Sequence, residues 1–264
     1  MLVIDDGSTD PASHTVLEEM RGRYPQFRFL TQPNAGIGAT RNRGLWEARG
    51  EYFLVMDADN IARPDMVARF VIAMQRNADL GAMTCYFLAF AESEHLRRGE
   101  YRYAYRPTGG PHILASLRNV YGDANALYHT ARFRAVGGYE TDRATSYEDW
   151  EAFVKLVQAG YRVDVIPEHL FYYRHLSGSF TRVTSDYHNR ARVLRQFFRC
   201  ESLPAAERVL LWTTLTGLRQ QVEAYAARDR LLIYRMADRL HTLGERVPRV
   251  KRCVKAVLTA CGLL

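Results

Sequence analysis

The chain has 264 residues, of which 47% are hydrophobic and 25% are charged, a composition typical of a globular protein with a sizeable core. No apolar run reaches the ~20 residues that a membrane-spanning helix needs. The net charge of +7 invites a nucleic-acid interpretation. However, the basic residues are spread along the chain and no aromatic-basic recognition motif is present, so we predict no nucleic-acid partner.

Two further features bear on location. The four cysteines form no C-x-x-C pair and no metal-ligand spacing, which predicts reduced thiols and a cytoplasmic protein. Basic residues cluster only in residues 246–264, where no acid occurs and apolar residues recur at helical spacing. This stretch is a candidate for peripheral contact with the inner face of a membrane. The alternative is a terminal helix packed on its own domain.

Strand-like and helix-like stretches alternate over about the first 180 residues. Strands are predicted at residues 2–4, 27–30 and 52–56. Helices are predicted around residues 16–20, over residues 38–49, and after Pro64, where Met66, Val67, Phe70, Val71 and Met74 would form the buried stripe. Such alternation predicts an α/β fold with a largely parallel sheet. Beyond about residue 183 only helical patterns remain, so we predict one domain over residues 1–182 and a helical C-terminal region over residues 183–264.

Carboxylates follow two of the predicted strands. The D-A-D sequence at residues 57–59 places two acids where they can converge on a hard divalent cation, Mg²⁺ or Mn²⁺. The alternative is a polar turn in which Asp59 or Asn60 caps the next helix. Asp5 and Asp6 end the first strand, at the edge where open parallel sheets bind ligands, although the D-D-G-S-T-D sequence also suits a solvated turn.

Three other patterns carry candidate functional residues. The G-I-G-A-T-R-N-R-G segment at residues 36–44 is not a dinucleotide fingerprint, because its sixth position is Arg41; this arginine is still a candidate phosphate contact. Asp149 is a candidate general base, but T-x-x-E at residues 145–148 equally fits a helix capping box. Arg174 and His175 are candidates for neutralising charge and holding a metal ion, or for plain surface residues.

Taken in order, DDGSTD, PNAGIGATRNRG, YFLVMDAD, VGGYE, YEDW and YYRHLSGS resemble the family-2 inverting glycosyltransferases of GT-A fold. The resemblance covers about residues 1–180. It implies a mixed, mainly parallel sheet flanked by helices. It also implies a transfer of sugar from a nucleoside-diphosphate sugar to a hydroxyl of a glycan, such as a cell-surface polysaccharide, or of a lipid-linked acceptor. The alternative is a catalytically silent binding or interaction module of the same fold.

The resemblance also implies a role for each matched residue. The catalytic base would be Asp149, and the turn at residues 137–139 would precede the acceptor side. A divalent metal ion, Mn²⁺ or Mg²⁺, would be the cofactor. The residues implied for nucleotide-sugar binding are Asp5, Asp6, Arg41, Asp57 and Arg174, and those for the metal are Asp59, Asp57 and His175.

Two expectations concern the edges of this site. In the resembled family a strand and a helix precede the first acidic pair, so the match implies an N-terminally incomplete domain with weak donor affinity and marginal stability. The alternative is that another segment or a partner fills the gap. Tyr101, Tyr103 and Tyr105 are candidate stacking platforms for the acceptor, or partly buried core aromatics.

Overall fold

The computed structural model describes residues 1–175, 184, 186–199, 204–221, 223, 224 and 227. The chain divides into two compact units, Met1–Leu211 and Trp212–Leu264. Residues 212–221 of the second unit are helical. The basic stretch at residues 246–264 and three of the cysteines, Cys200, Cys253 and Cys261, lie outside the described residues. Cys85 is a buried free thiol.

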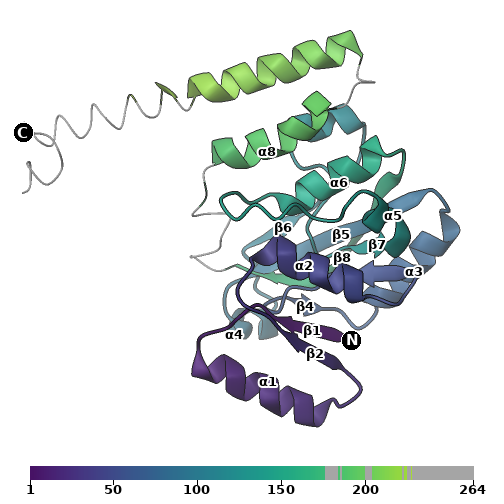
Figure 1. The fold of residues 1–264 in the computed structure, drawn as a ribbon, viewed down its shortest axis with the longest axis vertical. Helices are drawn as coiled ribbons and strands as arrows, with labels where there is room; N and C mark the ends of the chain where they lie inside the picture. The colour runs from purple at the N-terminus through teal and green to yellow at the C-terminus, as the bar shows by residue number, and fades with distance from the viewer. Residues whose placement is uncertain (176–183, 185, 200–203, 222, 225–226, 228–264) are drawn as a thin grey trace, which may run out of the picture. The chain divides into compact units, whose positions relative to one another are not determined.

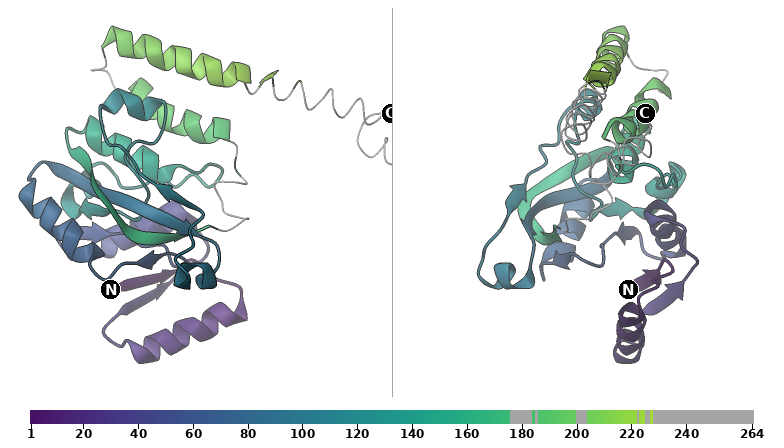
Figure 2. Two further views of the ribbon diagram at one scale, coloured as in Figure 1. Left: turned by 180° about the vertical axis from the view of Figure 1, so that it is seen from behind. Right: turned by 90° about the vertical axis from the view of Figure 1, so that its left-hand side faces the viewer.

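The chain begins with a small strand–helix–strand unit. Strand β1 (Leu2–Asp5) pairs in parallel with β2 (Arg28–Thr31), and helix α1 (Pro11–Arg23) connects them. The Asp10 side chain caps α1 by accepting a hydrogen bond from the backbone N–H of Ala12 at 2.9 Å. None of the residues of α1 is buried, and Figures 1 and 2 show the helix on the outer side of the strand pair.

A six-stranded sheet forms the centre of the first unit, in the order β3-β7-β5-β8-β4 (Figure 1). The sixth strand, β6, pairs with the C-terminal part of β5, beyond the residues that pair with β7. Only β5 and β8 run parallel within it; the other described pairs are antiparallel. Its strands are β3 (Tyr52–Leu54), β4 (Ile61–Ala62), β5 (Leu80–Phe90), β6 (Tyr103–Tyr105), β7 (Leu127–His129) and β8 (Arg162–Arg174).

The mixed α/β fold is therefore confirmed, but its described strand pairs are mainly antiparallel and not mainly parallel. The expectation rested on the alternation of strand-like and helix-like stretches over about the first 180 residues. Between β5 and β7 the connections contain only short helices, α4 (Ser93–Arg97) and η1 (His112–Ser116), and the chain returns along its own sheet. A parallel return needs a longer crossover, so these strands pair antiparallel.

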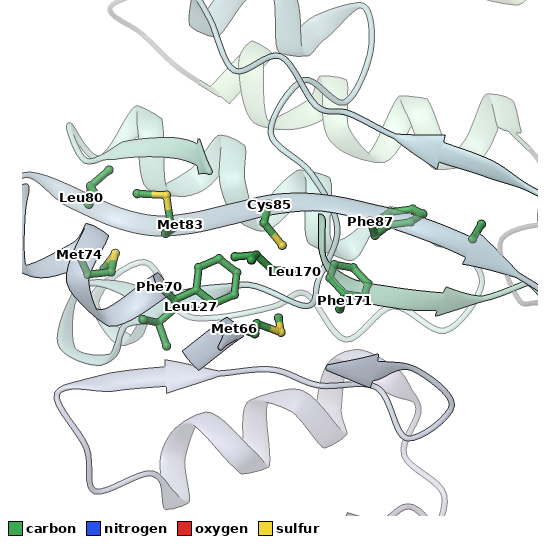
Figure 3. Packing of buried hydrophobic residues seen from close by; sticks show 11 residues of the cluster. Met66, Phe70, Met74, Leu80, Met83, Cys85, Phe87, Leu127, Leu170 and Phe171 are labelled. Carbon is green, nitrogen blue, oxygen red and sulfur yellow. The ribbon is translucent and has the colours of Figure 1, made fainter. Parts of the chain in front are cut away.

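The core lies between helix α3 (Met66–Arg76) and the sheet (Figure 3). Met66, Phe70 and Met74 recur every four residues and are buried against β5, β7 and β8. Val67 was predicted to belong to this stripe but is exposed, in the first turn of α3 and on the flank of the stripe. Val71 is partly buried at the margin of the cluster.

Helix α2 (Ile37–Glu47) packs against both sheets. A Cβ atom added at Gly44 would lie 3.4 Å from the Phe53 ring in β3 and 3.5 Å from the Ile4 side chain in β1. Helices α5 (Thr130–Ala135), α6 (Glu148–Gln158) and α8 (Asp186–Arg199) complete the described helices of this unit together with residues 205–211. Among the described residues, no helix is long and apolar enough to cross a membrane.

Candidate active site

A pocket of about 970 Å³ opens beside α2, α6 and the ends of β3 and β8. Six of the sequence-predicted residues line it, and two do not: Asp5 and Asp6 are absent from its walls. The pocket therefore brings the D-A-D acids together with the acid that begins α6. The predicted residues in its walls are Arg41, Asp57, Asp59, Asp149, Arg174 and His175.

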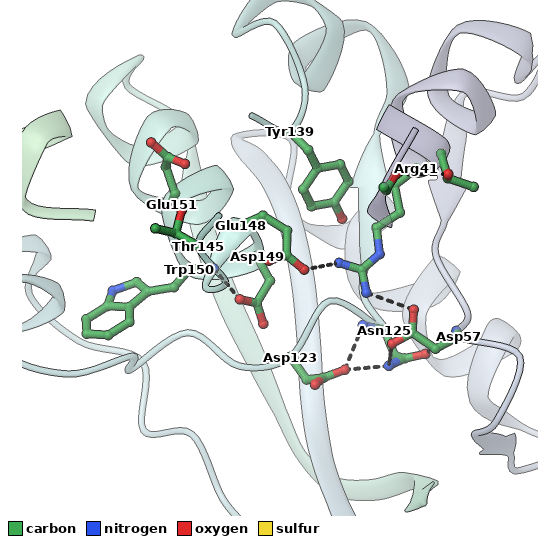
Figure 4. Close-up of polar contacts among 12 residues, drawn as sticks. Arg41, Asp57, Asp123, Asn125, Tyr139, Thr145, Glu148, Asp149, Trp150 and Glu151 are labelled. Carbon is green, nitrogen blue, oxygen red and sulfur yellow. Dashed lines mark hydrogen bonds and ion pairs between the residues drawn. The ribbon is translucent and has the colours of Figure 1, made fainter. Parts of the chain in front are cut away.

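Arg41 ties the two acidic sides of the pocket together (Figure 4). Its Nη1 donates to Glu148 Oε1 at 2.7 Å and its Nη2 donates to Asp57 Oδ1 at 2.8 Å. The guanidinium lies over the Tyr139 ring, 5.5 Å from its centroid, and the side chain is only 9% exposed. Burial opposes the charge, but Asp57 and Glu148 outweigh it and raise the pKa of Arg41 above its usual value. Arg41 therefore stays ionised and links α2, β3 and α6.

Asp57 is held from its other side by Asn125, a residue that the sequence analysis did not select. The Asn125 Oδ1 atom accepts from the backbone N–H of Asp57 at 2.9 Å, and its Nδ2 donates to Asp57 Oδ2 at 3.3 Å and to the Asp123 carboxylate. Burial, followed by the charge of Asp57, raises the pKa of Asp123 to about 6. The D-A-N sequence just before β7 repeats the D-A-D pattern, and that was the available signal.

Asp149 occupies the first turn of α6 and faces the pocket beside Asp123 (Figure 4). Its Oδ1 accepts from the backbone N–H of Trp150 at 2.7 Å. The carboxyl keeps some surface open to the pocket, but the walls enclose it. Burial and the charges of Glu148 and Asp123 raise its pKa to about 8. A helix N-terminus favours a negative charge, and here that effect is outweighed by burial and by the neighbouring acids.

The capping-box alternative for this segment is wrong. Helix α6 begins at Glu148 after Tyr147, and no side chain caps it. The Thr145 hydroxyl donates to Asp142 Oδ2 at 2.8 Å. Tyr147 has φ 72°, a left-handed conformation that is uncommon for a bulky residue. The turn at Tyr147 displaces the predicted cap from the helix axis and leaves Asp149 to face the pocket.

Asp59 and Arg174 line the pocket and contact each other. The Arg174 Nε donates to the backbone carbonyl of Asp59 at 3.1 Å, and its backbone N–H donates to Asn60 Oδ1 at 2.9 Å. Partial burial and the charge of Asp57 raise the pKa of the Asp59 carboxyl. Neither Asp59 nor Asn60 caps α3, whose N-cap residue is Asp65, so the capping alternative is not observed.

His175 lies at the pocket wall next to an aromatic residue. Its Nδ1 is 3.4 Å from the Tyr103 hydroxyl. In the part of the chain that the structure describes, no group of three or more His, Cys, Asp or Glu side chains is arranged to hold a metal ion. A two-carboxylate site that takes further ligands from a bound nucleotide is compatible with this arrangement, because Mg²⁺ commonly binds one or two carboxylates plus phosphate oxygens.

Asp5 accepts hydrogen bonds within its own turn, and Asp6 accepts them from the segment before α2. Asp5 Oδ1 accepts from the backbone N–H of Ser8 at 3.0 Å and from its hydroxyl at 2.6 Å. The two oxygens of Asp6 accept from the backbone N–H groups of Ala35 and Gly36, each at 2.9 Å. The Ser8 hydroxyl lowers the pKa of Asp5. Burial opposes the ionisation of Asp6, but the bonds from Ala35, Gln32 and Gly36 lower its pKa.

The Gly-rich segment at residues 36–44 packs closely against the turn at residues 137–141. A Cβ atom at Gly38 would lie 2.2 Å from the Glu140 carbonyl oxygen, and one at Gly138 would lie 2.4 Å from Asn42 Oδ1. The Asn42 amide donates to the Tyr139 carbonyl at 2.7 Å and accepts from its N–H at 2.8 Å. These contacts clamp α2 onto the turn at residues 137–141, which places Arg41 at the pocket.

Two of the three tyrosines that are candidate stacking platforms line the pocket. Tyr103 and Tyr105 line the pocket, Tyr103 being exposed and Tyr105 partly buried with its hydroxyl donating to the Asn119 carbonyl at 3.2 Å. Tyr101 is exposed and stacks on Tyr172 with centroids 6.1 Å apart.

Comparison with known proteins gives a family and a fold. The model of the family described as glycosyl transferase family 2 matches residues 1–137. The putative glycosyltransferase EpsH of Bacillus subtilis is 34% identical over 80 residues, which are 30% of this chain and 23% of that protein. The cholesterol galactosyltransferase of Borreliella burgdorferi is 34% identical over 94 residues, 34% of this chain and 25% of that protein. The chain thus spans about a quarter of the length of these curated relatives.

Solved structures support the fold at low identity. Residues 1–349 of Staphylococcus aureus TarS in complex with UDP-GlcNAc superpose with a TM-score of 0.60 and 15% identity, covering 81% of this chain and 62% of that one. The mannosyltransferase PcManGT of Pyrobaculum calidifontis, in complex with GDP-Man and Mn²⁺, superposes with a TM-score of 0.55 and 17% identity. The superposition covers 99% of this chain and 76% of that one. These likenesses confirm the GT-A fold.

Proposed function

This chain belongs to glycosyl transferase family 2, and on that premise we propose that it is an inverting, metal-dependent glycosyltransferase. It would move a sugar from a nucleoside-diphosphate sugar to a hydroxyl of a glycan or lipid-linked acceptor. The observation that carries this proposal is the placement of Asp149 in one pocket with Asp57 and Asp59. The nucleotide-sugar complexes of the two structural neighbours support the donor class.

The proposed role of Asp149 is that of general base. Its carboxylate takes the proton from the acceptor hydroxyl, and the oxygen attacks the anomeric carbon of the donor. The bond from that carbon to the diphosphate oxygen breaks, and the nucleoside diphosphate leaves with the bonding electron pair. A pKa near 8 suits this task, because a base is most effective when its pKa lies close to the working pH. A single displacement inverts the anomeric configuration and requires no protein nucleophile.

The proposed cation site centres on Asp59, and Asp57, Arg174 and His175 line the same pocket. The oxygens of Asp57 already accept from Arg41 and Asn125, whereas burial and the charge of Asp57 raise the pKa of Asp59. Asp59 is therefore the carboxylate with more capacity for a hard divalent ion such as Mn²⁺ or Mg²⁺. When bound, the ion would neutralise charge on the leaving diphosphate.

Two substitutions test these roles separately. Purified protein with Mn²⁺ is screened by thermal shift against UDP-, GDP- and dTDP-sugars, and transfer is then measured with the donor that binds. Asp149→Asn should lower turnover by roughly 10²- to 10⁴-fold while the donor Kd changes by less than about twofold. Asp59→Ala should abolish the Mn²⁺-dependent part of donor binding.

Other outcomes separate the competing possibilities. Wild-type turnover in Asp149→Asn at saturating donor would show that the base is misassigned. Tight donor binding by the wild type without transfer to any glycan or lipid-linked acceptor would support the alternative of a silent binding module. The engagement of Asp5 and Asp6 by their own backbone is the observation that keeps that alternative open.

A further inference from the structure

The loop that leads into α6 is held by α8, a helix some forty residues further along the chain. The backbone carbonyl of Thr145 accepts from Arg192 Nη1 at 3.1 Å, and its hydroxyl oxygen lies 3.2 Å from the same atom. The backbone N–H of Ser146 donates to Asn189 Oδ1 at 2.9 Å, and Asn189 Nδ2 donates back to the Ser146 hydroxyl oxygen at 2.9 Å. Both loop residues are thus fixed by side chains of α8.

The next residue, Tyr147, is also bonded to α8. Its hydroxyl donates to Asp186 Oδ1 at 2.8 Å. Asp149 follows two residues later, so three consecutive residues immediately before the Glu148–Asp149 pair each have a partner on α8. The left-handed conformation of Tyr147 is strained for a side chain of this size, and such strain persists only where the surroundings fix the backbone. The α8 contacts supply that restraint.

Burial makes the central contact specific. Asn189 is 0% exposed and Ser146 is 2% exposed, so water does not replace their hydrogen bonds. Both polar atoms of the Asn189 amide are hydrogen-bonded to the loop: Oδ1 accepts from the Ser146 backbone N–H, and Nδ2 donates to the Ser146 hydroxyl oxygen. An apolar side chain at this position would leave a buried backbone N–H without a partner, and the loop would move to find one.

The same helix also contacts the body of α6, and Arg192 takes part in both sets of contacts. Gln196 Nε2 donates to Glu151 Oε1 at 2.6 Å, and Arg192 forms a buried ion pair with the other oxygen of Glu151. Gln196 is buried, as Asn189 is, but it contacts α6 beyond the residues that line the pocket. Asn189 therefore holds the loop before α6, whereas Gln196 holds the body of α6.

We propose that α8 positions the base for catalysis, with Asn189 as the principal positioning residue. This inference rests on the proposed function in one respect, the role of Asp149 as base. Asn189 touches neither the pocket nor Asp149; it acts by fixing the path of residues 145–147. A displacement of about 1 Å at a reacting group can lower turnover by about a hundredfold, which is the range in which loss of this restraint should appear.

The test compares Asn189→Ala with Gln196→Ala as its matched control. Each variant loses one buried amide from α8, so we expect similar decreases in melting temperature. Asn189→Ala should lower kcat by roughly tenfold to a hundredfold and leave the donor KM within about twofold of wild type. Gln196→Ala should retain the wild-type kcat. Hydrogen–deuterium exchange of residues 143–149 should accelerate in Asn189→Ala and remain at the wild-type rate in Gln196→Ala.

A milder variant covers the case in which Asn189→Ala does not fold. Tyr147→Phe removes only the hydroxyl that bonds Asp186, and it should lower kcat by about twofold to tenfold with faster exchange at residues 143–149. Equal loss of kcat in the Asn189 and Gln196 variants, or unchanged exchange in the Asn189 and Tyr147 variants, would overturn the proposal. If the wild type transfers no sugar, the proposed function fails, and the exchange measurements still decide whether α8 fixes the loop.

Discussion

The helix that follows the first strand and the helix that carries Asp149 are built in opposite ways. Helix α1 has 13 residues and none of them is buried, whereas seven of the 11 residues of α6 are buried. Helix α1 covers one small strand pair. Helix α6 packs on β5, β8, η1 and α8. The proposed base thus stands on a helix whose position is fixed by packing on several sides.

The carboxylates of the two regions differ in the same way. Asp6 receives three hydrogen bonds, from the Gln32 side chain and from the backbone N–H groups of Ala35 and Gly36, and its pKa is lowered. Asp149 accepts one described hydrogen bond, lies among other acids, and has a raised pKa. A carboxylate surrounded by donors stabilises the fold as an anion. One that is enclosed with few donors is ready to take a proton.

The two regions should differ most in the free energy of unfolding that is lost when an arginine is removed from each of them. Arg41→Met leaves Asp57 and Glu148 without their shared partner in an enclosed site, and we expect a loss of about 3 to 5 kcal/mol in the free energy of unfolding. Arg21→Met in α1 breaks an exposed pair with Glu18 and should cost about 1 kcal/mol or less. Urea unfolding of both variants checks this, and equal losses would show that the bridge at Arg41 adds no stability of its own.

Glycine-to-alanine substitutions sharpen the comparison, because the change in the free energy of unfolding should have opposite signs in the two regions. A Cβ at Gly38 would lie 2.2 Å from a backbone carbonyl, so Gly38→Ala must displace α2 and should destabilise by about 1 to 3 kcal/mol. Gly22 lies in α1, where an added Cβ atom would meet nothing within 4 Å outside its own stretch of helix. Gly22→Ala should therefore stabilise by about 0.5 to 1 kcal/mol. Thermal unfolding measures both. A destabilising Gly22→Ala would show that α1 is more enclosed than its exposed surface indicates.

The two sets of carboxylates should respond to pH in opposite directions. Because the pKa of Asp5 and Asp6 is lowered, their stabilisation is complete above their unfolded value near 3.8 and is lost as pH falls below it. The pKa of Asp149 is raised to about 8, so its protonated form is favoured by folding, and that stability is lost as pH rises from about 4 through 8. One such group changes stability by at most about 1.4 kcal/mol per pH unit.

The measurement is the urea midpoint of metal-free protein from pH 3 to 9. We expect the midpoint to fall on both sides of a maximum at mildly acidic pH. In Asp149→Asn, which cannot ionise, the alkaline decrease should be smaller, while the acid limb should match that of wild type. An unchanged alkaline limb in this variant would mean that the carboxyl of Asp149 is already ionised at neutral pH in the folded protein.

Local signals in the sequence were sufficient for the first half of the fold. Strands ending at Asp5 and Leu54, and the helix that begins at Ile37, follow from apolar periodicity, and the order of the acidic motifs gave the family. The antiparallel return of β7 was not predictable from periodicity, because three-residue strands carry no usable period and their direction depends on long-range pairing.

The candidate site was predictable where the residue type and its position after a strand or at a helix start indicate a function. Asp57, Asp59 and Asp149 were selected as acids in suggestive positions, and the fold brings them to one pocket. Asn125 was missed because its importance arises from a contact 68 positions away in the chain. Asp6 was selected as an acid after a strand, but sequence alone does not reveal that two backbone N–H groups some thirty positions later point at it.

Finally, the separation of the two sheets has a consequence for how the protein opens. In the described residues no hydrogen-bonded strand pair joins β1–β2 to the larger sheet, and α2 packs on strands of both through Gly44. Proteins often open in cooperative blocks whose free energies differ, and a block with few buried contacts opens first. The β1–α1–β2 unit is such a block. We therefore expect it to detach transiently as one piece while β5 and β8 remain paired, so that proteolytic nicking under native conditions begins before residue 32.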